Sequence, residues 1–252
     1  KIKKLNNNIN LLFVGDNSTD GSQEVIINLR KKNKKVNYFF RKKKLGVGSA
    51  HKLGIKFAKK KNYRYVCTMD CDGTHNPKYI NIMLKKIKKS HMVITNRFMK
   101  KNSMTGWGFL RIMQTNLRYY LVRILLGSKL DGSGGFRLYD LKVIKIKDIF
   151  EAEDNYYNFF WMSAFILEYR KYKISEIPID LPNRVLGSSK MKSSDVFIGL
   201  LKLIKIFADM HTEIFSFQNI GNDKNGISEN HFKISPCCIW TLNFQSCVGS
   251  GI

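Results

Sequence analysis

Two carboxylates stand two residues apart where an apolar run ends. Asp70 and Asp72 follow the run YRYVCTM, and a stretch that opens with Pro77 comes after them. Carboxylate oxygens are hard ligands that suit Mg²⁺ or Mn²⁺. A cation held there would neutralise a diphosphate and stabilise it as a leaving group. Because an Asp-x-Asp pair occurs by chance in many chains, its place at a strand end is what makes it a candidate metal site.

Two further polar loops follow predicted strands. Asp16 lies in VGDNSTDGS, after the run 9–16, and is a candidate acceptor for the base or ribose of a nucleotide. The same segment also fits a simple turn with a helix cap. The segment RKKKLGVGSAHKLG places Gly48 before a predicted helix, where the backbone could approach a phosphate. Its glycine spacing differs from the dinucleotide-binding fingerprint, so alone it is a weak signal.

These candidate residues need a scaffold that brings strand ends together. Short apolar runs alternate with amphipathic stretches, which predicts strands at 9–16, 36–40, 63–70 and 91–98 and helices at 22–32, 48–60 and 77–89. Such alternation predicts an α/β fold with a mostly parallel central sheet, covered by helices on both faces. Ligands in these folds bind beyond the carboxyl ends of the strands. Farther on, the pattern predicts helices at 107–126, 157–172 and 195–210, a Gly-rich loop at 131–137 and a strand at 173–181.

The charge balance favours an anionic partner. The 252 residues include 44 Lys and Arg against 19 Asp and Glu, a formal net charge of +25. Nucleic acid, an acidic membrane surface or a phosphorylated substrate would each suit it, although biased composition also fills solvated faces with Lys. The positive excess lies within residues 1–210. No apolar run is long enough to predict a membrane-spanning helix, and the helix 195–210 fits either a membrane surface or the core.

Six segments follow one another along the chain: VGDNSTDGS, RKKKLGVGSAHKLGIKFA, MDCDGTHNP, NRF with a Trp and an Arg after it, DGSGGFR, and EIPIDLPNRVLGSSKM. In their order and spacing they resemble the family 2 glycosyltransferases, in the dolichyl-phosphate mannose synthase or polyprenyl-phosphate glycosyltransferase branch. The resemblance covers about residues 11–207.

The resemblance implies a GT-A, Rossmann-like nucleotide-sugar-binding fold, and it assigns roles by position. By the resemblance, Asp70 and Asp72 bind the metal, Mg²⁺ or Mn²⁺. The catalytic residues are Asp72, Arg97 and Arg184. The residues that bind the donor nucleotide are Asp16, Asp70 and Gly48. The residues that bind the acceptor phosphate are Arg111, Asp131, Arg137 and Lys190.

The implied reaction transfers mannose from GDP-mannose to dolichyl or polyprenyl phosphate, with inversion and with a metal. We expect residues 1–210 to form the GT-A domain without its usual opening strand, and we assign no structure to residues 211–252. Gly134 stands where the family has Ser. Three alternatives stay open: a UDP-sugar donor, a non-catalytic homologue favoured by these departures, and a basic nucleic-acid-binding module.

The resemblance also implies where the protein acts and with what. We expect a peripheral protein on the cytosolic face of a membrane, the endoplasmic reticulum in a eukaryote or the plasma membrane in a prokaryote. A small membrane-anchoring subunit is a candidate partner. We expect no nucleic-acid partner, because the Arg residues fall in loops after strands instead of alternating with aromatic residues on one surface.

Overall fold

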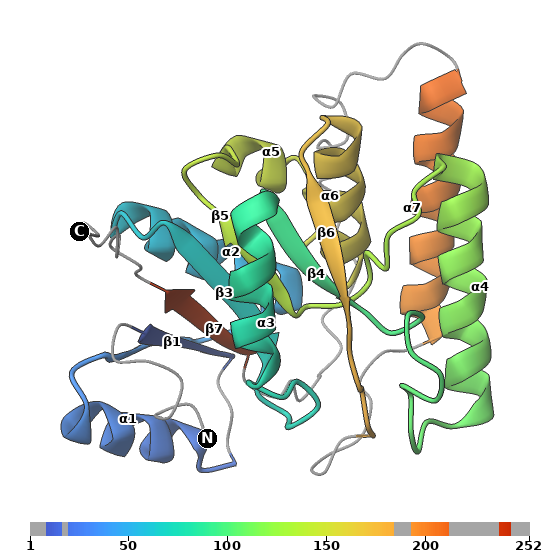
Figure 1. Cartoon of the computed structure of the whole chain (residues 1–252). Helices are drawn as coiled ribbons and strands as arrows, with labels where there is room; N and C mark the ends of the chain where they lie inside the picture. The colour runs from blue at the N-terminus through green and yellow to red at the C-terminus, as the bar shows by residue number, and fades with distance from the viewer. Residues whose placement is uncertain (1–8, 17–19, 184–192, 212–236, 243–252) are drawn as a thin grey trace.

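The computed structural model describes residues 9–16, 20–183, 193–211 and 237–242. They form an α/β fold around one seven-stranded sheet with the order β2-β1-β7-β3-β5-β4-β6 (Figure 1). Strands β5 and β7 run antiparallel to the other five, which share one direction. The strands are β1 Ile9–Asp16, β2 Val36–Arg41, β3 Tyr65–Asp70, β4 Met92–Asn96, β5 Arg137–Asp140, β6 Ile174–Pro178 and β7 Cys237–Leu242.

The predicted helices are confirmed, with small shifts at their ends. The sequence pattern missed the short α5 and the strands β5 and β7. The helices are α1 Ser22–Lys32, α2 Val47–Lys60, α3 Tyr79–Lys86 with the 3₁₀ turn η2 Ile87–Lys89, α4 Phe109–Leu126, α5 Ile146–Phe150, α6 Asn158–Tyr169 and α7 Ser193–His211.

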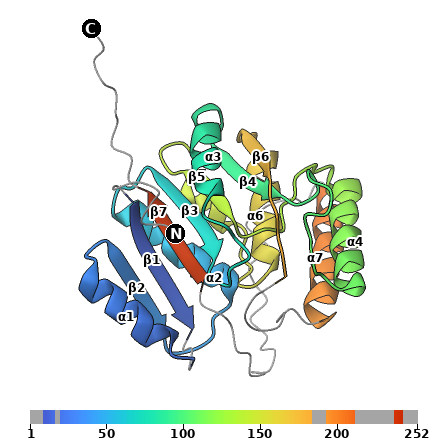
Figure 2. The same cartoon turned by 60° about the horizontal axis from the view of Figure 1, so that its bottom comes forward.

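Strand β7 is the main departure from the expected organisation. It comes from residues 211–252, for which the sequence predicted no structure, and it lies between β1 and β3. Cys238 is in register with Phe13 on one side and with Met69 on the other, antiparallel in both cases. The C-terminal part of the chain therefore contributes to the same sheet as the predicted GT-A domain (Figure 2).

Alternate residues of the strands supply two apolar layers, one on each face of the sheet. Leu12, Val66 and Met92 belong to the layer shared with α2, α5 and α6. Their neighbours in sequence, such as Cys67 and Val93, belong to the layer under α3. This period of two is the expected result for strands that are buried on both faces.

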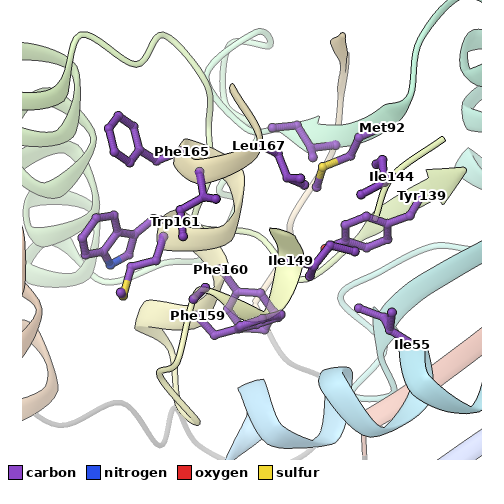
Figure 3. Packing of buried hydrophobic residues seen from close by; sticks show 14 of the residues in the cluster. Ile55, Met92, Tyr139, Ile144, Ile149, Phe159, Phe160, Trp161, Phe165 and Leu167 are labelled. Atoms are coloured by element: carbon purple, nitrogen blue, oxygen red, sulfur yellow. The ribbon is translucent and has the colours of Figure 1, made fainter. Parts of the chain in front are cut away.

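Helix α6 is buried along almost its whole length, which fixes one wall of the larger layer. Its side chains reach in two directions (Figure 3): Leu167 lies toward Met92 of β4, while Trp161 and Phe165 extend on the other side. Phe159 and Phe160 pack edge to face, with ring centroids 5.7 Å apart. Because so much apolar area surrounds it, this helix is a rigid base for the loops that pack on it.

Helices α4 and α7 lie side by side at one end of the molecule (Figures 1 and 2). Val122 and Leu126 of α4 share a buried cluster with Leu203 and Ile206 of α7. Helix α4 ends at Gly127, whose φ of +66° is the left-handed conformation that favours glycine at this position. The sequence did not decide whether α7 packs on the core or lies on a membrane. In the structure, one side of α7 packs on the core.

Three parallel strands place their polar ends at one edge of the sheet, here called the carboxyl edge. Strands β1, β3 and β4 finish there with Asp16, Asp70 and Asn96. Strand β5 runs the other way, so it begins at this edge with Arg137, which is in register with Thr68 and Ile94. The topology thus gathers most of the candidate residues at the edge where α/β folds bind ligands.

Gly46 and Gly48, at the N-cap and in the first turn of α2, lie close to backbone as well as side-chain atoms. A Cβ on Gly48 would lie 2.7 Å from Phe159 Cβ and 2.8 Å from the Tyr156 carbonyl oxygen. Gly46 has a φ of +88° and would place a Cβ 2.3 Å from the Asn155 carbonyl oxygen. These glycines let α2 approach the segment before α6, and the donor-binding role of Gly48 stays a prediction.

We predict that Gly48→Ala lowers the free energy of unfolding by about 1–3 kcal/mol, because the new methyl group has no space in a packed interior. Chemical denaturation measures the change. Gly108→Ala is the matched control, since a Cβ there meets nothing within 4 Å. Its cost at a helix N-cap is below about 1 kcal/mol. Equal stability of the two variants would contradict the packing role of Gly48.

Candidate active site

The Gly-rich loop between α4 and β5 separates two chemically different ends of the carboxyl edge. A Cβ on Gly134 would lie 3.5 Å from an outer nitrogen of Arg97, and a Cβ on Gly135 would lie 3.4 Å from Asp70 Oδ1. Successive Cα atoms are only about 3.8 Å apart. A guanidinium and a carboxylate therefore flank consecutive residues of one loop, and we call them the cationic end and the acidic end of the site.

Asp70 and Asp72 make up the acidic end. Asp72 Oδ1 accepts hydrogen bonds from the Thr74 backbone N–H at 3.1 Å and from Thr74 Oγ1 at 2.6 Å. The Asp70 backbone N–H donates to His75 Nδ1 at 2.9 Å, which places the proton of neutral His75 on Nε2. Both carboxylates are half-buried, so they are oriented by their own loop and accessible from outside.

The acidic end supplies some of the ligands that a hard divalent cation needs. No group of three or more Asp, Glu, His or Cys side chains gathers as a metal site among the described residues. Two carboxylates on one turn supply oxygen ligands of the right type, and Mg²⁺ is commonly held by one or two carboxylates together with substrate phosphates. Asp70 and Asp72 are therefore the residues that would hold such an ion, with a bound diphosphate completing its ligands.

Asp16, the last residue of β1, lies at the carboxyl edge and forms an ion pair with Arg41. Its Oδ1 accepts from Arg41 Nε at 2.5 Å, and its Oδ2 accepts from the Leu45 backbone N–H at 3.3 Å. The other end of the Arg41 guanidinium donates to Ser49 Oγ at 2.7 Å. Asp16 therefore anchors the loop that enters α2. Arg41, which sequence reasoning did not single out, carries that link.

Arg97 and Asp131 form a buried ion pair at the cationic end. Asp131 Oδ2 accepts from Arg97 Nε at 2.7 Å and from the Arg97 backbone N–H at 3.1 Å, and both side chains are less than 10% exposed. Burial by itself would raise the pKa of Asp131. The guanidinium and backbone N–H of Arg97, with the Ser133 hydroxyl, outweigh burial and hold that pKa below its ordinary value.

Glu176 supports this pair from β6, and sequence reasoning missed it. Its Oε1 accepts from the Asp131 backbone N–H at 2.8 Å and from Asn96 Nδ2 at 3.0 Å. Burial, and then the negative charges of Asp131 and Glu168, raise the pKa of Glu176. Strand β6 thus fixes the first residue of the Gly-rich loop, although the segment EIPIDLPNRVLGSSKM gave Glu176 no role of its own.

Arg111 extends the cationic end onto α4. Its Cζ lies 3.5 Å from the Trp107 ring centroid, and Arg97 Cζ lies 5.8 Å from the same ring. Stacking on a ring face leaves the edges of a guanidinium available for hydrogen bonds. Trp107 thus brings two of the predicted phosphate-binding arginines together.

Arg137 is placed differently from the prediction of direct contact with an acceptor phosphate. Its side chain is fully buried, and it donates to the carbonyl oxygens of Gly132, Gly134 and Phe160 and to Ser163 Oγ. All of these acceptors belong to the protein, so the guanidinium braces the Gly-rich loop against α6 from behind. The motif indicated a functional loop, but it did not reveal which arginine faces outward.

The two remaining predicted residues, Arg184 and Lys190, lie outside the described residues. Of the others, the structure gathers Asp70 and Asp72 at the acidic end and Arg97, Arg111 and Asp131 at the cationic end. Asp16, at the end of β1, lies at the same edge, while Gly48 and Arg137 pack within the fold.

The carboxyl edge of this α/β sheet thus brings an Asp-x-Asp turn beside paired arginines, an arrangement that suits enzymes acting on phosphorylated substrates. The sequence pattern of glycosyl transferase family 2 matches residues 2–146, more than half of the chain. The chain therefore belongs to glycosyl transferase family 2. It is a glycosyltransferase with the GT-A, Rossmann-like fold expected from the sequence.

Two curated relatives are similar over most of the chain. Undecaprenyl-phosphate mannosyltransferase of Micrococcus luteus is 28% identical over 187 residues, which cover 74% of this chain and 77% of the relative. Polyprenol monophosphomannose synthase of Mycolicibacterium smegmatis is 25% identical over 198 residues, covering 77% of this chain and 75% of the relative. These similarities confirm the polyprenyl-phosphate branch as the one that the chain resembles.

We predict that Asp131→Asn lowers the free energy of unfolding by about 3–5 kcal/mol near pH 7, because it leaves Arg97 buried without its counter-charge. The folded-state pKa of Asp131 lies below its ordinary 3.8, so its stabilisation is present above that value and is lost as the pH falls through the folded-state pKa. Chemical denaturation from pH 8 to pH 3 measures the difference in free energy of unfolding between the natural protein and Asp131→Asn. This difference should stay constant down to about pH 4 and shrink below it.

Asp180→Asn is the matched control for that series. Asp180 pairs with Lys100 at 2.5 Å, but both side chains are at least 40% exposed. Its loss should cost no more than about 1 kcal/mol. Similar losses in the two variants would contradict the special position of the buried pair.

Proposed function

We propose that this glycosyltransferase transfers mannose from GDP-mannose to a dolichyl or polyprenyl phosphate, with inversion and with a divalent cation, at a membrane surface. The observation that carries the proposal is the flanking of consecutive Gly134 and Gly135 by Arg97 and Asp70. Transfer to a lipid phosphate requires a metal-bound diphosphate and a second phosphate to come within bonding distance of one sugar. A carboxylate and a guanidinium on one short loop suit those two phosphates.

The chemistry of the acceptor explains which residues the reaction needs. A phosphate monoester is already ionised near neutral pH, so its oxygen can attack the anomeric carbon without a dedicated general base. The new bond forms between that oxygen and the sugar while the bond to the nucleoside diphosphate breaks, which inverts the anomeric centre. A cation at Asp70 and Asp72 would supply charge neutralisation to the leaving diphosphate. Arg97 and Arg111 would orient the acceptor phosphate and screen its charge.

The relatives support the acceptor and the sugar. Their names state action on undecaprenyl phosphate in one case and synthesis of polyprenol monophosphomannose in the other. From that similarity we infer a polyprenyl-phosphate acceptor for this chain. The guanine nucleotide and the metal rest on the chemistry of the site and on the family resemblance.

Membrane contact is supported by the outward side of the α4 and α7 pair. Both helices carry large exposed apolar side chains at helical spacing, a set that we call the α4–α7 stripe. The stripe consists of Phe109, Leu110, Met113, Leu117, Tyr120 and Ile124 on α4 and Phe197, Leu201 and Ile204 on α7, each 49–78% exposed. Within the described residues, no helix has the length and apolar character that a membrane crossing requires.

The stripe also suits the acceptor. It lies on the helix that carries Arg111, so a lipid phosphate could keep its chain in the bilayer while its head group reaches the cationic end. We place the contact on the cytosolic leaflet, where nucleotide sugars are available and where Lys and Arg favour anionic lipids. A helical anchoring subunit could cover the same stripe, and the vesicle experiment below separates these two partners.

We predict transfer of labelled mannose from GDP-mannose to a short polyprenyl phosphate in the presence of Mg²⁺ or Mn²⁺. UDP-glucose and UDP-N-acetylglucosamine serve as alternative donors in the same assay. Asp72→Asn should lower kcat by at least about a hundredfold, because the leaving diphosphate loses a stabilising cation. Glu24→Gln, on the exposed face of α1, is the control and should keep full activity.

Product from a UDP-sugar alone would correct the donor. Full activity in Asp72→Asn, or with metal chelated, would overturn the metal assignment. The proposed transfer to a lipid phosphate fails if the natural protein forms no lipid-linked product from any of the three donors.

We predict that Phe109→Glu combined with Ile124→Glu weakens sedimentation with phospholipid vesicles by at least about tenfold. Burial of each of these side chains contributes about 1.5–3 kcal/mol, and a charge at the same place opposes it. Val25→Glu is the control: Val25 is 60% exposed on α1, at the other end of the sheet. Binding by the natural protein to another subunit but not to vesicles would identify the stripe as a protein interface.

A further inference from the structure

Arg118 is a half-buried arginine for which the structure gives no hydrogen bond or ion pair with any described residue. It projects from α4 into a small pocket that it lines together with Asp131, Gly132, Ser133 and Trp161. A half-buried guanidinium without a hydrogen-bond acceptor among the described residues can donate to an anion that enters the pocket. The family motifs in the sequence do not include this residue.

A stack of two aromatic rings holds the segment that carries Arg97 against the part of α4 that carries Arg118. Phe98, the next residue after Arg97, stacks on Tyr119, the next residue after Arg118, with centroids 4.0 Å apart. Asp131 contacts Arg97 directly and also lines the Arg118 pocket. Two segments far apart in sequence thus present their guanidinium groups around one carboxylate.

Two guanidinium groups act on the Asp131 carboxylate. It accepts from Arg97 directly, and it attracts Arg118 electrostatically. Burial, and then repulsion by Arg97, lower the pKa of Arg118 to about 10, with Asp131 opposing the shift. Arg118 therefore stays charged at neutral pH and offers a guanidinium beside the Gly-rich loop to an anion.

We propose that Arg118 binds the phosphate head group of the lipid acceptor, as a further guanidinium beside Arg97. The inference rests on the proposed function and adds a residue to its acceptor site. The position of Arg118 favours the lipid phosphate over the donor diphosphate, because its neighbours Leu117 and Tyr120 are exposed members of the α4–α7 stripe. The acidic end, by contrast, is reached past Gly135, on the Asp70 side of the loop.

Steady-state kinetics of Arg118→Gln and Arg118→Lys test the role. We expect the KM for polyprenyl phosphate to rise at least tenfold in Arg118→Gln and by less in Arg118→Lys, while the KM for the donor stays within twofold. A lost charge-assisted hydrogen bond accounts for a change of this size. Arg123→Gln is the matched control. Arg123 is an exposed arginine on the same helix, and within the described part of the chain its guanidinium donates only a long hydrogen bond, 3.4 Å, to the Tyr119 hydroxyl.

Thermal unfolding of each variant separates binding from folding. Removal of a cation that Arg97 repels should leave the unfolding temperature of Arg118→Gln at or above the natural value. An acceptor KM within twofold of the natural protein would overturn the inference. A donor KM that rises as much as the acceptor KM would also overturn it, because Arg118 would then serve both phosphates.

Binding without catalysis makes the inference testable even if no donor is found. The probes are neutral phosphatidylcholine vesicles, the same vesicles with added polyprenyl phosphate, and the same vesicles with phosphatidylglycerol at equal charge. We expect polyprenyl phosphate to tighten binding of the natural protein, and Arg118→Gln to remove most of that gain without changing the phosphatidylglycerol result. If Arg118→Gln weakened binding equally to vesicles with polyprenyl phosphate and to vesicles with phosphatidylglycerol, Arg118 would attract any anionic membrane. That result would contradict a specific phosphate site.

Discussion

The buried pair between Arg97 and Asp131 is the interaction on which the arrangement of this site depends. One carboxylate oxygen receives both the side chain and the backbone of Arg97, so a single acid fixes the end of β4 against the start of the Gly-rich loop. A buried ion pair is not in itself a strong source of stability, but loss of either partner is costly. The pair therefore specifies one position for the loop, and the acidic and cationic ends keep their separation.

The rest of the fold maintains that position from several sides. Glu176 holds the Asp131 backbone from β6, and Arg137 ties the loop carbonyls to α6 from beneath. Helix α6 can serve as the support because its apolar side chains are almost entirely buried. The active loop of this glycosyltransferase is thus glycine-rich in sequence and yet firmly braced, which suits a reaction that must align two phosphates on one sugar.

Much of the fold was predictable because its signals are local. Buried strands and amphipathic helices show their periods in sequence, so β1, α1 and α4 appear close to their predicted bounds. Strand β5 was missed because it has four residues and follows a loop of glycines. Strand β7 was missed because its place depends on pairing with two strands far away in sequence. The candidate residues were found by motif, but a motif does not show direction: Arg137 faces inward. Arg118 belongs to no motif, so the sequence did not single it out.

The most direct measurement is a structure of the protein with Mn²⁺, GDP and a short-chain polyprenyl phosphate. We expect the metal at Asp70 and Asp72, and the lipid phosphate oxygens within about 3 Å of the Arg97 guanidinium, the range of charge-assisted hydrogen bonds. The lipid chain should leave along α4. A lipid phosphate bound away from Arg97, or a metal held without Asp70 and Asp72, would show that the braced loop does not align the two phosphates.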